Sequence, residues 1–333
     1  MKHINVGLFV PHEGCPHTCT FCNQRSISGS SVRLTKEMVD SAVSIAIDRE
    51  YDKSNSEIAF FGGSFTAIDT DYMIYLLKSA FPYVEKGFFK GIRCSTRPDA
   101  IDEDILSILK KYGVTAIELG AQSMSDKVLS MNERGHTVEH IVNASHLIKK
   151  HGFELGLQMM TGLYGDDNKT AIKTADKIIA LQPDTVRIYP TVVLKNTKLA
   201  QLYNSGIYQA QKLDDAVELC ADLLEKFNKN NIKVIRLGLH SGGNVEDGYI
   251  AGAYHPAFRE LCESRIYFNS VKKIINDKNI KGNVTIYVSP KEISKMTGQK
   301  KTNLENLKTM GVNAHVKGCD ELDKYQVRLI CEE

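Results

Sequence analysis

Three cysteines lie within eight residues near the start of the chain. Cys15, Cys19 and Cys22 stand in the segment GCPHTCTFCNQRSISG, where glycine, proline and polar residues surround them. Because three is an odd number and we expect a reducing compartment, a disulfide framework does not suit this loop. Three thiols at this spacing predict a metal site.

Two kinds of metal suit such a loop. Structural zinc takes four closed ligands, so a zinc site would have to recruit His12, His17 or a distant cysteine. An iron–sulfur cluster held by three thiolates has one iron without a protein ligand, and that iron is open to a substrate or cofactor. An extended chain spans about 3.5 Å per residue, so these gaps let one loop reach three corners of a cubane.

The remaining cysteines are scattered singly through the chain. We interpret them as small buried hydrophobic residues or surface thiols without a chemical role. They are Cys94, Cys220, Cys262, Cys319 and Cys331.

Short apolar runs alternate with helical patterns over most of the chain. Strands are predicted at residues 4 to 10, 57 to 63, 91 to 96, 116 to 122, 154 to 160, 185 to 191 and 233 to 239. This alternation indicates βα units and a parallel sheet, either open and doubly wound or closed into a full or partial barrel. Ligands of such sheets bind where the strands end. We therefore expect the cysteine loop to meet the other strand ends, which carry Gly62, Gly63, Ser64, Ser95, Gln122 and Gln158.

The composition is that of an ordinary globular protein. Of 333 residues, 42% are hydrophobic and 25% are charged, which excludes a disordered chain. The formal net charge of +2 excludes a polycation that binds nucleic acid by overall charge alone. No stretch approaches about 18 apolar residues and no secretory leader is recognisable, so we expect a cytoplasmic protein that does not enter a membrane.

A glycine-rich, polar stretch at residues 240 to 256 marks a predicted domain boundary. We expect a barrel over residues 1 to 242 and a small C-terminal α/β domain over residues 243 to 333. Six lysines and two glutamates lie between residues 281 and 308, around the turn TGQKKTN. Gly298 begins a turn similar to that of KH domains, but the second glycine of that motif is missing. The stretch is either a solvated face or an RNA contact.

The cysteine motif and the segments that follow it resemble a known family. The pattern Cys-x-x-x-Cys-x-x-Cys after a first strand is similar to that of the radical S-adenosylmethionine (SAM) enzymes. FFGGSFTAI, STRPDAI, IELGAQSMSDKVLSMNERGHT and RIYPTVVLKNTKLAQLYNSGIY resemble, in the same order, segments of the radical-SAM domain of the Elongator catalytic subunit family. The resemblance covers roughly residues 5 to 240.

The resemblance implies a partial (β/α)₆ TIM-like barrel of radical-SAM type. It also implies a [4Fe–4S] cluster on Cys15, Cys19 and Cys22, whose unique iron chelates SAM. An electron from a flavodoxin-type or ferredoxin-type donor then cleaves SAM, and the 5′-deoxyadenosyl radical takes a hydrogen atom from the substrate. The 93 residues after residue 240 are too few for the acetyltransferase domain of that family, so we do not expect its carboxymethylation reaction.

The same resemblance implies which residues hold SAM. The carbonyls of Gly62 and Gly63, followed by Ser64, meet the methionine amino group, and Arg134 pairs with the carboxylate. Gln122 and Gln158 match positions of polar cofactor contacts, and Phe9 matches an aromatic residue that packs beside the cofactor. Ser95 stands where relatives usually carry a glutamate, so this chain supplies a neutral hydroxyl there. The SAM-contacting candidates are Phe9, Gly62, Gly63, Ser64, Ser95, Gln122, Arg134 and Gln158.

Further polar residues have a structural interpretation. Glu118 stands among apolar neighbours on a predicted strand, so it is either a functional residue of the barrel interior or part of a salt bridge. Arg97 and Asp99 are expected to pair with each other.

The leading hypothesis is a radical SAM enzyme that modifies tRNA or another RNA. The alternatives are a radical SAM oxidoreductase acting on a small molecule, and a zinc-stabilised RNA-binding module without catalysis.

Overall fold

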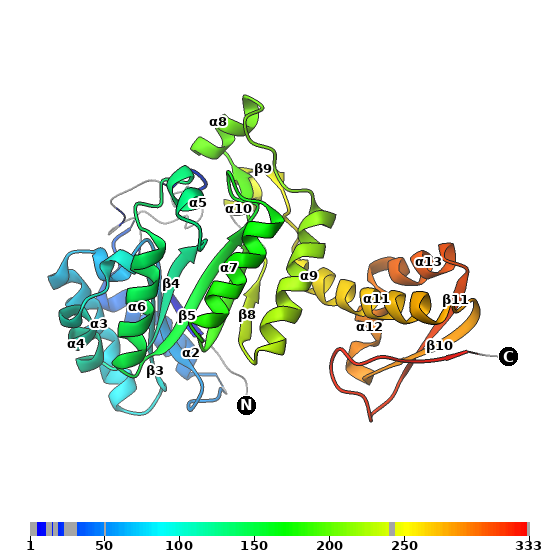
Figure 1. Ribbon diagram of the computed structural model, residues 1–333. Helices are drawn as coiled ribbons and strands as arrows, with labels where there is room; N and C mark the ends of the chain where they lie inside the picture. Colours follow the sequence, from blue (N-terminus) through cyan, green and yellow to red (C-terminus); the bar gives the residue numbers. More distant parts are fainter. Residues whose placement is uncertain are drawn as a thin grey trace.

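The computed structural model describes residues 5–10, 15, 19–22, 32–49, 51–239 and 244–331. Seven parallel strands form the main sheet, in the order β1-β2-β3-β4-β5-β6-β8 (Figure 1). They are β1 (Asn5–Val10), β2 (Glu57–Gly62), β3 (Gly91–Thr96), β4 (Val114–Gln122), β5 (Glu154–Thr161), β6 (Thr185–Pro190) and β8 (Lys233–Leu237). The seven strands predicted from the apolar runs are thus confirmed, as is the partial barrel with its helices on the outside.

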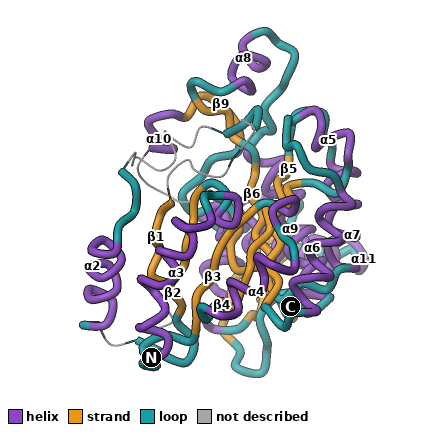
Figure 2. Tube along the Cα trace, turned by 90° about the vertical axis from the view of Figure 1, so that its left-hand side faces the viewer, coloured by secondary structure: helices purple, strands orange, loops and turns teal. Residues whose placement is uncertain are grey.

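Helices between the strands cover the outer face of this sheet (Figures 1 and 2). They are α2 (Lys36–Ile47), α3 (Thr70–Glu85), α4 (Glu103–Lys111), α6 (Val138–Lys150), α7 (Asn168–Ala180) and α9 (Leu213–Lys229), and two short helices, α5 (Asp126–Met131) and α8 (Lys198–Asn204), also follow strands of the barrel. Two short 3₁₀ turns, Phe65–Ala67 and Pro98–Ala100, follow β2 and β3. In both views α5 and α8 lie toward the end of the sheet at which the strands finish.

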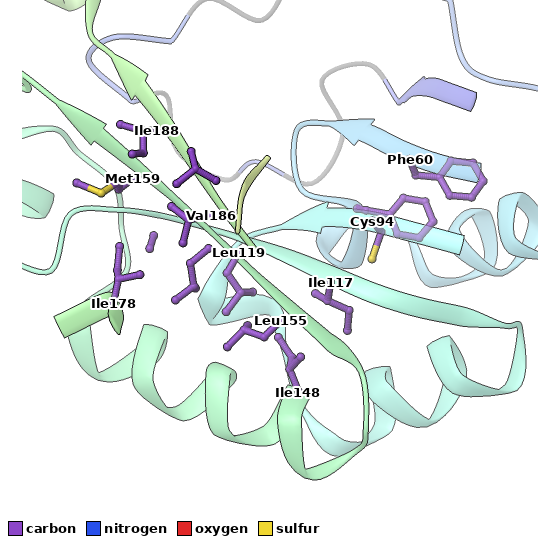
Figure 3. Close-up of a cluster of buried hydrophobic side chains, with 14 of the residues drawn as sticks. Phe60, Cys94, Ile117, Leu119, Ile148, Leu155, Met159, Ile178, Val186 and Ile188 are labelled. Carbon is purple, nitrogen blue, oxygen red and sulfur yellow. The ribbon is translucent and has the colours of Figure 1, made fainter. Parts of the chain in front are cut away.

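The main core lies between the sheet and its outer helices. Every second residue of β1 is buried, namely Val6, Leu8 and Val10, while Phe9 lies on the opposite, inner face. Figure 3 shows the same arrangement further along the sheet, where Leu119, Leu155 and Val186 pack toward Ile148 and Ile178 of the helices. Because side chains alternate along a strand, this core orients the other set of residues into the barrel interior.

The segment at residues 240 to 256 is more regular than the sequence predicts. Residues 240–243 lie outside the described part, but α10 (Asn244–Gly248) and β9 (Tyr249–Gly252) follow directly. β9 pairs antiparallel with β7 (Val192–Leu194), far away in the sequence. A short strand without periodicity gains its structure from such a partner, which local patterns do not reveal.

A smaller sheet follows, in the order β11-β10-β12. β10 (Gly282–Val288) pairs parallel with β11 (Val312–Gly318) and antiparallel with β12 (Arg328–Cys331). The helices α11 (Phe258–Lys278), α12 (Ile293–Thr297) and α13 (Thr302–Thr309) accompany it, with 3₁₀ turns at Pro290–Glu292 and Gln299–Lys301. This mixture of helices and strands agrees with the small C-terminal α/β domain expected from the sequence.

α11 belongs to two cores. Phe258, Cys262 and Ile266 pack into the main core, whereas Tyr267 and Val271 pack into a second core under the smaller sheet. The helix therefore joins the two parts by packing as well as by chain continuity. The division at residue 242 stays a prediction. No helix of the described residues is both long and apolar enough to cross a bilayer.

Buried charges link neighbouring strands inside the barrel. The Arg93 guanidinium lies 2.7 Å from Glu57, 3.4 Å from Glu118 and 3.1 Å from Glu154. Arg187 of β6 makes a second ion pair with Glu118, with Nη2 2.7 Å from Oε1. Burial alone would lower the pKa of Arg93, but the adjacent Glu57 and Glu118 carboxylates raise it above its ordinary value. Glu118 is therefore salt-bridged within the barrel interior, and five neighbouring strands, β2 to β6, are tied together by charge.

Replacing Arg93 should destabilise the barrel strongly. In Arg93→Met, Glu57 and Glu118 remain buried without their cation, so we expect a loss of about 3 to 5 kcal/mol in the free energy of unfolding. Urea denaturation followed by circular dichroism measures this loss. The control is Lys90→Met, which removes only an exposed partner of Glu154 and should change stability by less than about 1 kcal/mol. Equal stability of the two variants would contradict the network's structural role.

Candidate functional site

The ends of β1 and β2 meet at one edge of the sheet. Val10 pairs with Gly62, and Gly62 has a φ of +125°. A Cβ atom at Gly62 would lie 2.1 Å from the carbonyl oxygen of Val10. Only glycine permits this approach, and the next residues, Gly63 and Ser64, continue from it into the loop.

Thr20 anchors the second half of the cysteine motif. Its backbone N donates to the Asn132 carbonyl at 3.2 Å, and its own carbonyl accepts from Leu199 N at 2.7 Å. Its hydroxyl donates to Asn132 Oδ1 at 2.9 Å. Thr20 and Asn132 are both almost fully buried. Since Cys22 N also donates to the Cys19 carbonyl, Cys19 and Cys22 lie in a turn that is fixed to the barrel from two sides.

Asn132 is in turn held firmly in place. Its side-chain amide donates to the carbonyls of Val128 and Tyr164 at 2.8 and 2.9 Å. The sequence analysis did not single out Asn132, although it lies in the NERGH segment beside Arg134. Its polar side chain, two residues before the predicted cofactor contact Arg134, was the feature of the sequence that could have identified it.

Arg134 connects this turn with the end of β4. One terminal nitrogen donates to Cys19 Sγ at 3.0 Å and the other to the Gly120 carbonyl at 2.8 Å. The Arg134 carbonyl accepts from Arg97 Nη2 at 2.8 Å, and Arg97 also makes two 2.9 Å bonds to Asp99. The expected pair of Arg97 and Asp99 is confirmed. It fixes the loop that carries Arg134 next to the cysteine turn.

Polar atoms without partners face this region. Ser95 Oγ, Gln122 Oε1 and Arg134 Nε are buried and make no hydrogen bond within the described part of the chain. Each unsatisfied buried polar group destabilises a protein by about 1 to 3 kcal/mol unless a ligand pairs with it. The positions fit a small molecule with several polar groups, and the thiols of the adjacent turn fit an iron–sulfur cluster.

Gln122 is placed by an irregularity in β4. The pairing of β4 with β5 shifts register between Leu119 and Gln122, and Gln122 has a φ of +65°. Such bulges redirect a side chain at the end of a strand, and a left-handed backbone is uncommon for a residue other than glycine. The strain is thus located at a residue predicted to contact the cofactor.

The remaining predicted cofactor contacts differ in whether their side chains already make hydrogen bonds within the protein. The Ser64 hydroxyl lies 2.8 Å from Thr96 Oγ1 and accepts from Arg97 N at 3.1 Å, so it is already engaged within the protein. Phe9 and Gln158 are half-buried on the inner face of β1 and β5. Their contact with a cofactor stays a prediction.

The binding of a metal by the three cysteines stays a prediction. Among the residues that the structure describes, no three His, Cys, Asp or Glu side chains are placed to hold a metal ion. His12 and His17, the alternative zinc ligands, lie outside those residues. Of the scattered cysteines, Cys94, Cys220 and Cys262 are fully buried, and burial raises the pKa of Cys94 and of Cys220 to about 12. These two thiols are protonated and unreactive, as expected.

The inner face of the last strands carries positive charge that the sequence analysis missed. Arg187 and Arg236 are paired in the register of β6 and β8, and Arg187 lies over the Phe61 ring at 5.2 Å. Arg236 donates to the Gly238 carbonyl at 2.9 Å and has no carboxylate partner in the described residues. Burial, together with the charges of Arg187 and Arg259, lowers its pKa below the ordinary value. The sequence feature that could have indicated this charge was an arginine in each of two consecutive predicted strands.

Comparison with known proteins gives this site a context. The sequence matches the Radical SAM superfamily over residues 9–178 and the Radical_SAM C-terminal domain over residues 183–267. Elongator complex protein 3 of Mus musculus is 32% identical over 188 residues, which are 50% of this chain and 34% of that protein. A tRNA uridine(34) acetyltransferase of Methanocaldococcus jannaschii is 30% identical over 49% of this chain and 34% of its own length. The chain thus matches about a third of these relatives.

A solved structure shares the fold. The archaeal Elp3 of Methanocaldococcus infernus, with residues 1–46 deleted, superposes with a TM-score of 0.62 at 19% identity. The match covers 84% of this chain and 65% of that one. This agreement extends the likeness from the cysteine motif to the arrangement of strands and helices.

The close approach at Gly62 gives a test of the site's framework. Gly62→Ala forces the new Cβ against the Val10 carbonyl, so β1 must move, and we expect a loss of roughly 3 kcal/mol or more in stability. Gly7→Ala is the matched control on β1, because its Cβ would lie 3.8 Å from the Phe61 ring, an ordinary contact. Chemical denaturation of both variants measures the difference. A Gly62→Ala variant as stable as Gly7→Ala would disprove the constraint.

Proposed function

Because the chain belongs to the radical SAM superfamily of enzymes, we propose that Cys15, Cys19 and Cys22 bind a [4Fe–4S] cluster and that the neighbouring strand ends bind SAM. The observation that carries this proposal is the fixed turn of Cys19 and Cys22 beside Ser95, Gln122 and Arg134, each of which has one buried polar atom without a hydrogen-bond partner in the described residues. Bound together, cluster and SAM would supply one-electron cleavage of the sulfonium bond and abstraction of a substrate hydrogen atom.

Each residue at the strand ends has a defined task in this proposal. Arg134 Nε is the donor left for the SAM carboxylate, since both terminal nitrogens are engaged by Cys19 and Gly120. Gln122 and Ser95 offer neutral hydrogen-bonding groups to the amino or ribose part of SAM. Gly62 and Gly63 let backbone carbonyls approach the ligand, and Phe9 and Gln158 line the inner face beside it.

The cysteine turn must keep its position when the cluster changes charge. Thr20, through three hydrogen bonds to Asn132 and Leu199, holds the turn independently of the metal. The Arg134 guanidinium lies against Cys19 Sγ and stabilises negative charge on that sulfur. The protein thus supplies position and charge balance, while an electron donor of flavodoxin or ferredoxin type supplies the electron.

We infer that the substrate is a tRNA or another RNA. The support is the similarity to proteins whose names include Elongator complex protein 3 and tRNA uridine(34) acetyltransferase. The match takes in about a third of each, so the complete reaction of those proteins is not transferred to this chain. A cytoplasmic location is part of the same inference.

Loss of any one cysteine of the motif should abolish the cluster. We expect Cys15→Ala, Cys19→Ala and Cys22→Ala, purified and reconstituted without oxygen, to lose iron and sulfide, the visible absorption band and formation of 5′-deoxyadenosine from SAM. Cys331→Ala, which removes an exposed cysteine outside the motif, is the control and should retain all four. A colourless wild-type protein that holds one zinc ion would overturn the proposal.

The RNA substrate is tested separately. We expect the modified nucleosides of total tRNA, measured by liquid chromatography and mass spectrometry, to change when the gene is deleted and to return with the wild-type gene but not with Cys22→Ala. Formation of 5′-deoxyadenosine by the purified enzyme together with an unchanged nucleoside profile would favour a small-molecule substrate instead.

A further inference from the structure

The turn between α12 and α13 connects two helices of the smaller domain. β10 and β11 are adjacent and parallel, and the connection between them consists of these two helices and the turn from Gly298 to Lys301. Two helices joined by a short glycine-containing turn form the backbone clamp of KH domains, which bind single-stranded nucleic acid. This similarity makes the turn a candidate binding site for a nucleic acid.

A buried side chain holds this turn rigid. The Asn303 amide donates to Ser264 Oγ and to the Met296 carbonyl, both at 3.0 Å, and Asn303 is 6% exposed. Gly298 packs so closely that an added Cβ would lie 2.9 Å from Asn303 N. Because Ser264 belongs to α11, the turn is anchored to the long helix that also packs on the barrel. The conformation of the turn is therefore set by contacts within the protein.

Lysines occupy the positions where a glycine would be expected. Lys300 and Lys301 have φ angles of +51° and +64°, in the left-handed region that favours glycine. The second glycine that the sequence lacks is thus replaced, in conformation, by Lys301. Two successive left-handed residues are strained, and such strain at an exposed turn is typical of a functional site.

The charge of this surface is not neutralised by the protein. Lys291, Lys300, Lys301 and Lys308 are exposed and make no ion pair among the described residues. Lys295 and Lys324, in contrast, are paired with Glu263. Some lysines of the domain are thus neutralised by its own carboxylates, whereas those at the turn are exposed and can bind an anion.

A cavity lies between the barrel and the helix that precedes the turn. It measures about 490 Å³ between β8, the start of α11 and α12, and its lining includes Arg236, Arg259 and Lys295 together with Glu260 and Glu263. Glu263 pairs with both Arg259 and Lys295, whereas Arg236 has no carboxylate partner among the described residues. Lys295 precedes the turn by one helical turn, so the turn is linked through α12 to the edge strand β8.

We propose that the turn from Gly298 to Lys301 binds the phosphate backbone of the RNA substrate through Lys300 and Lys301 and so positions that RNA beside the barrel. The inference rests on the proposed RNA substrate. The lysine ammonium group is a compact positive charge that binds phosphate. Such contacts add to the affinity for a nucleic acid but do not distinguish its sequence. The large hydrophobic side chains that are exposed in the described residues all lie outside residues 281–310, so an apolar anchor for a membrane or a protein partner is missing there.

The test measures binding of unfractionated tRNA to the full-length protein by fluorescence anisotropy between 50 and 200 mM salt. Lys300→Ala/Lys301→Ala should weaken binding roughly tenfold or more and reduce the slope of log K against log salt by about 1 to 2. Lys300→Arg/Lys301→Arg should retain both affinity and slope, because it keeps the charges. Lys169→Ala/Lys173→Ala, which removes two exposed lysines of α7, is the control and should bind as the wild type does.

The outcomes separate this inference from the proposed function. Wild-type affinity in Lys300→Ala/Lys301→Ala would overturn the assignment of the turn and leave the RNA substrate intact. Absence of tRNA binding by the wild type would overturn the RNA substrate itself. Equal loss of binding to polyglutamate or to phosphatidylserine vesicles would show a general anionic surface and also overturn the assignment. Formation of 5′-deoxyadenosine without substrate should stay unchanged in every variant, which confirms that the barrel is folded.

Discussion

The candidate site depends on the hydrogen bonds of one threonine. Thr20 stands between two cysteines of the motif and uses its amide, its carbonyl and its hydroxyl to bind the end of α5 and the start of α8. A loop with thiols as its only fixed points would change shape with the state of its metal. With Thr20 buried against Asn132, half of the loop is fixed to the barrel by hydrogen bonds that do not involve a metal ligand.

The same principle extends to the surrounding residues. Arg97, paired with Asp99, holds the carbonyl of Arg134, and Arg134 reaches Cys19 and Gly120. The contacts of Arg97 with Arg134, and of Arg134 with Cys19 and Gly120, cross from one strand end or loop to another. The site is therefore preorganised by a chain of hydrogen bonds, while the atoms that stay unsatisfied are located where a ligand is expected.

Charge within the barrel divides into two regions. Glu57, Glu118 and Glu154 neutralise Arg93 and Arg187, which ties the strands together. Arg236, on the edge strand, lacks such a partner among the described residues and faces the cavity shared with α12. The arginine without a carboxylate partner thus lies on the side of the barrel next to the smaller domain, which carries exposed lysines of its own.

Much of this protein is determined by local sequence. The periods of apolar residues located the strands of the main sheet, because alternation and helical spacing reflect burial directly. The three cysteines and the ordered motifs indicated the radical SAM superfamily, which the family match confirmed, since few residue combinations are suited to an iron–sulfur cluster. The pair of Arg97 and Asp99 was predictable because the two residues are close in the chain.

Tertiary structure decided the remainder. Asn132 and Thr20 are 112 residues apart, and the pairing of β7 with β9 joins segments without periodicity, so no local pattern indicates either contact. Ser64 has the residue type of a cofactor contact, but its hydroxyl is engaged by Thr96. The left-handed lysines at the α12–α13 turn, beside the buried Asn303 that bonds to α11, likewise have no signal in the local sequence. Contacts between distant segments set these features, because their free energy arises only when the chain is folded.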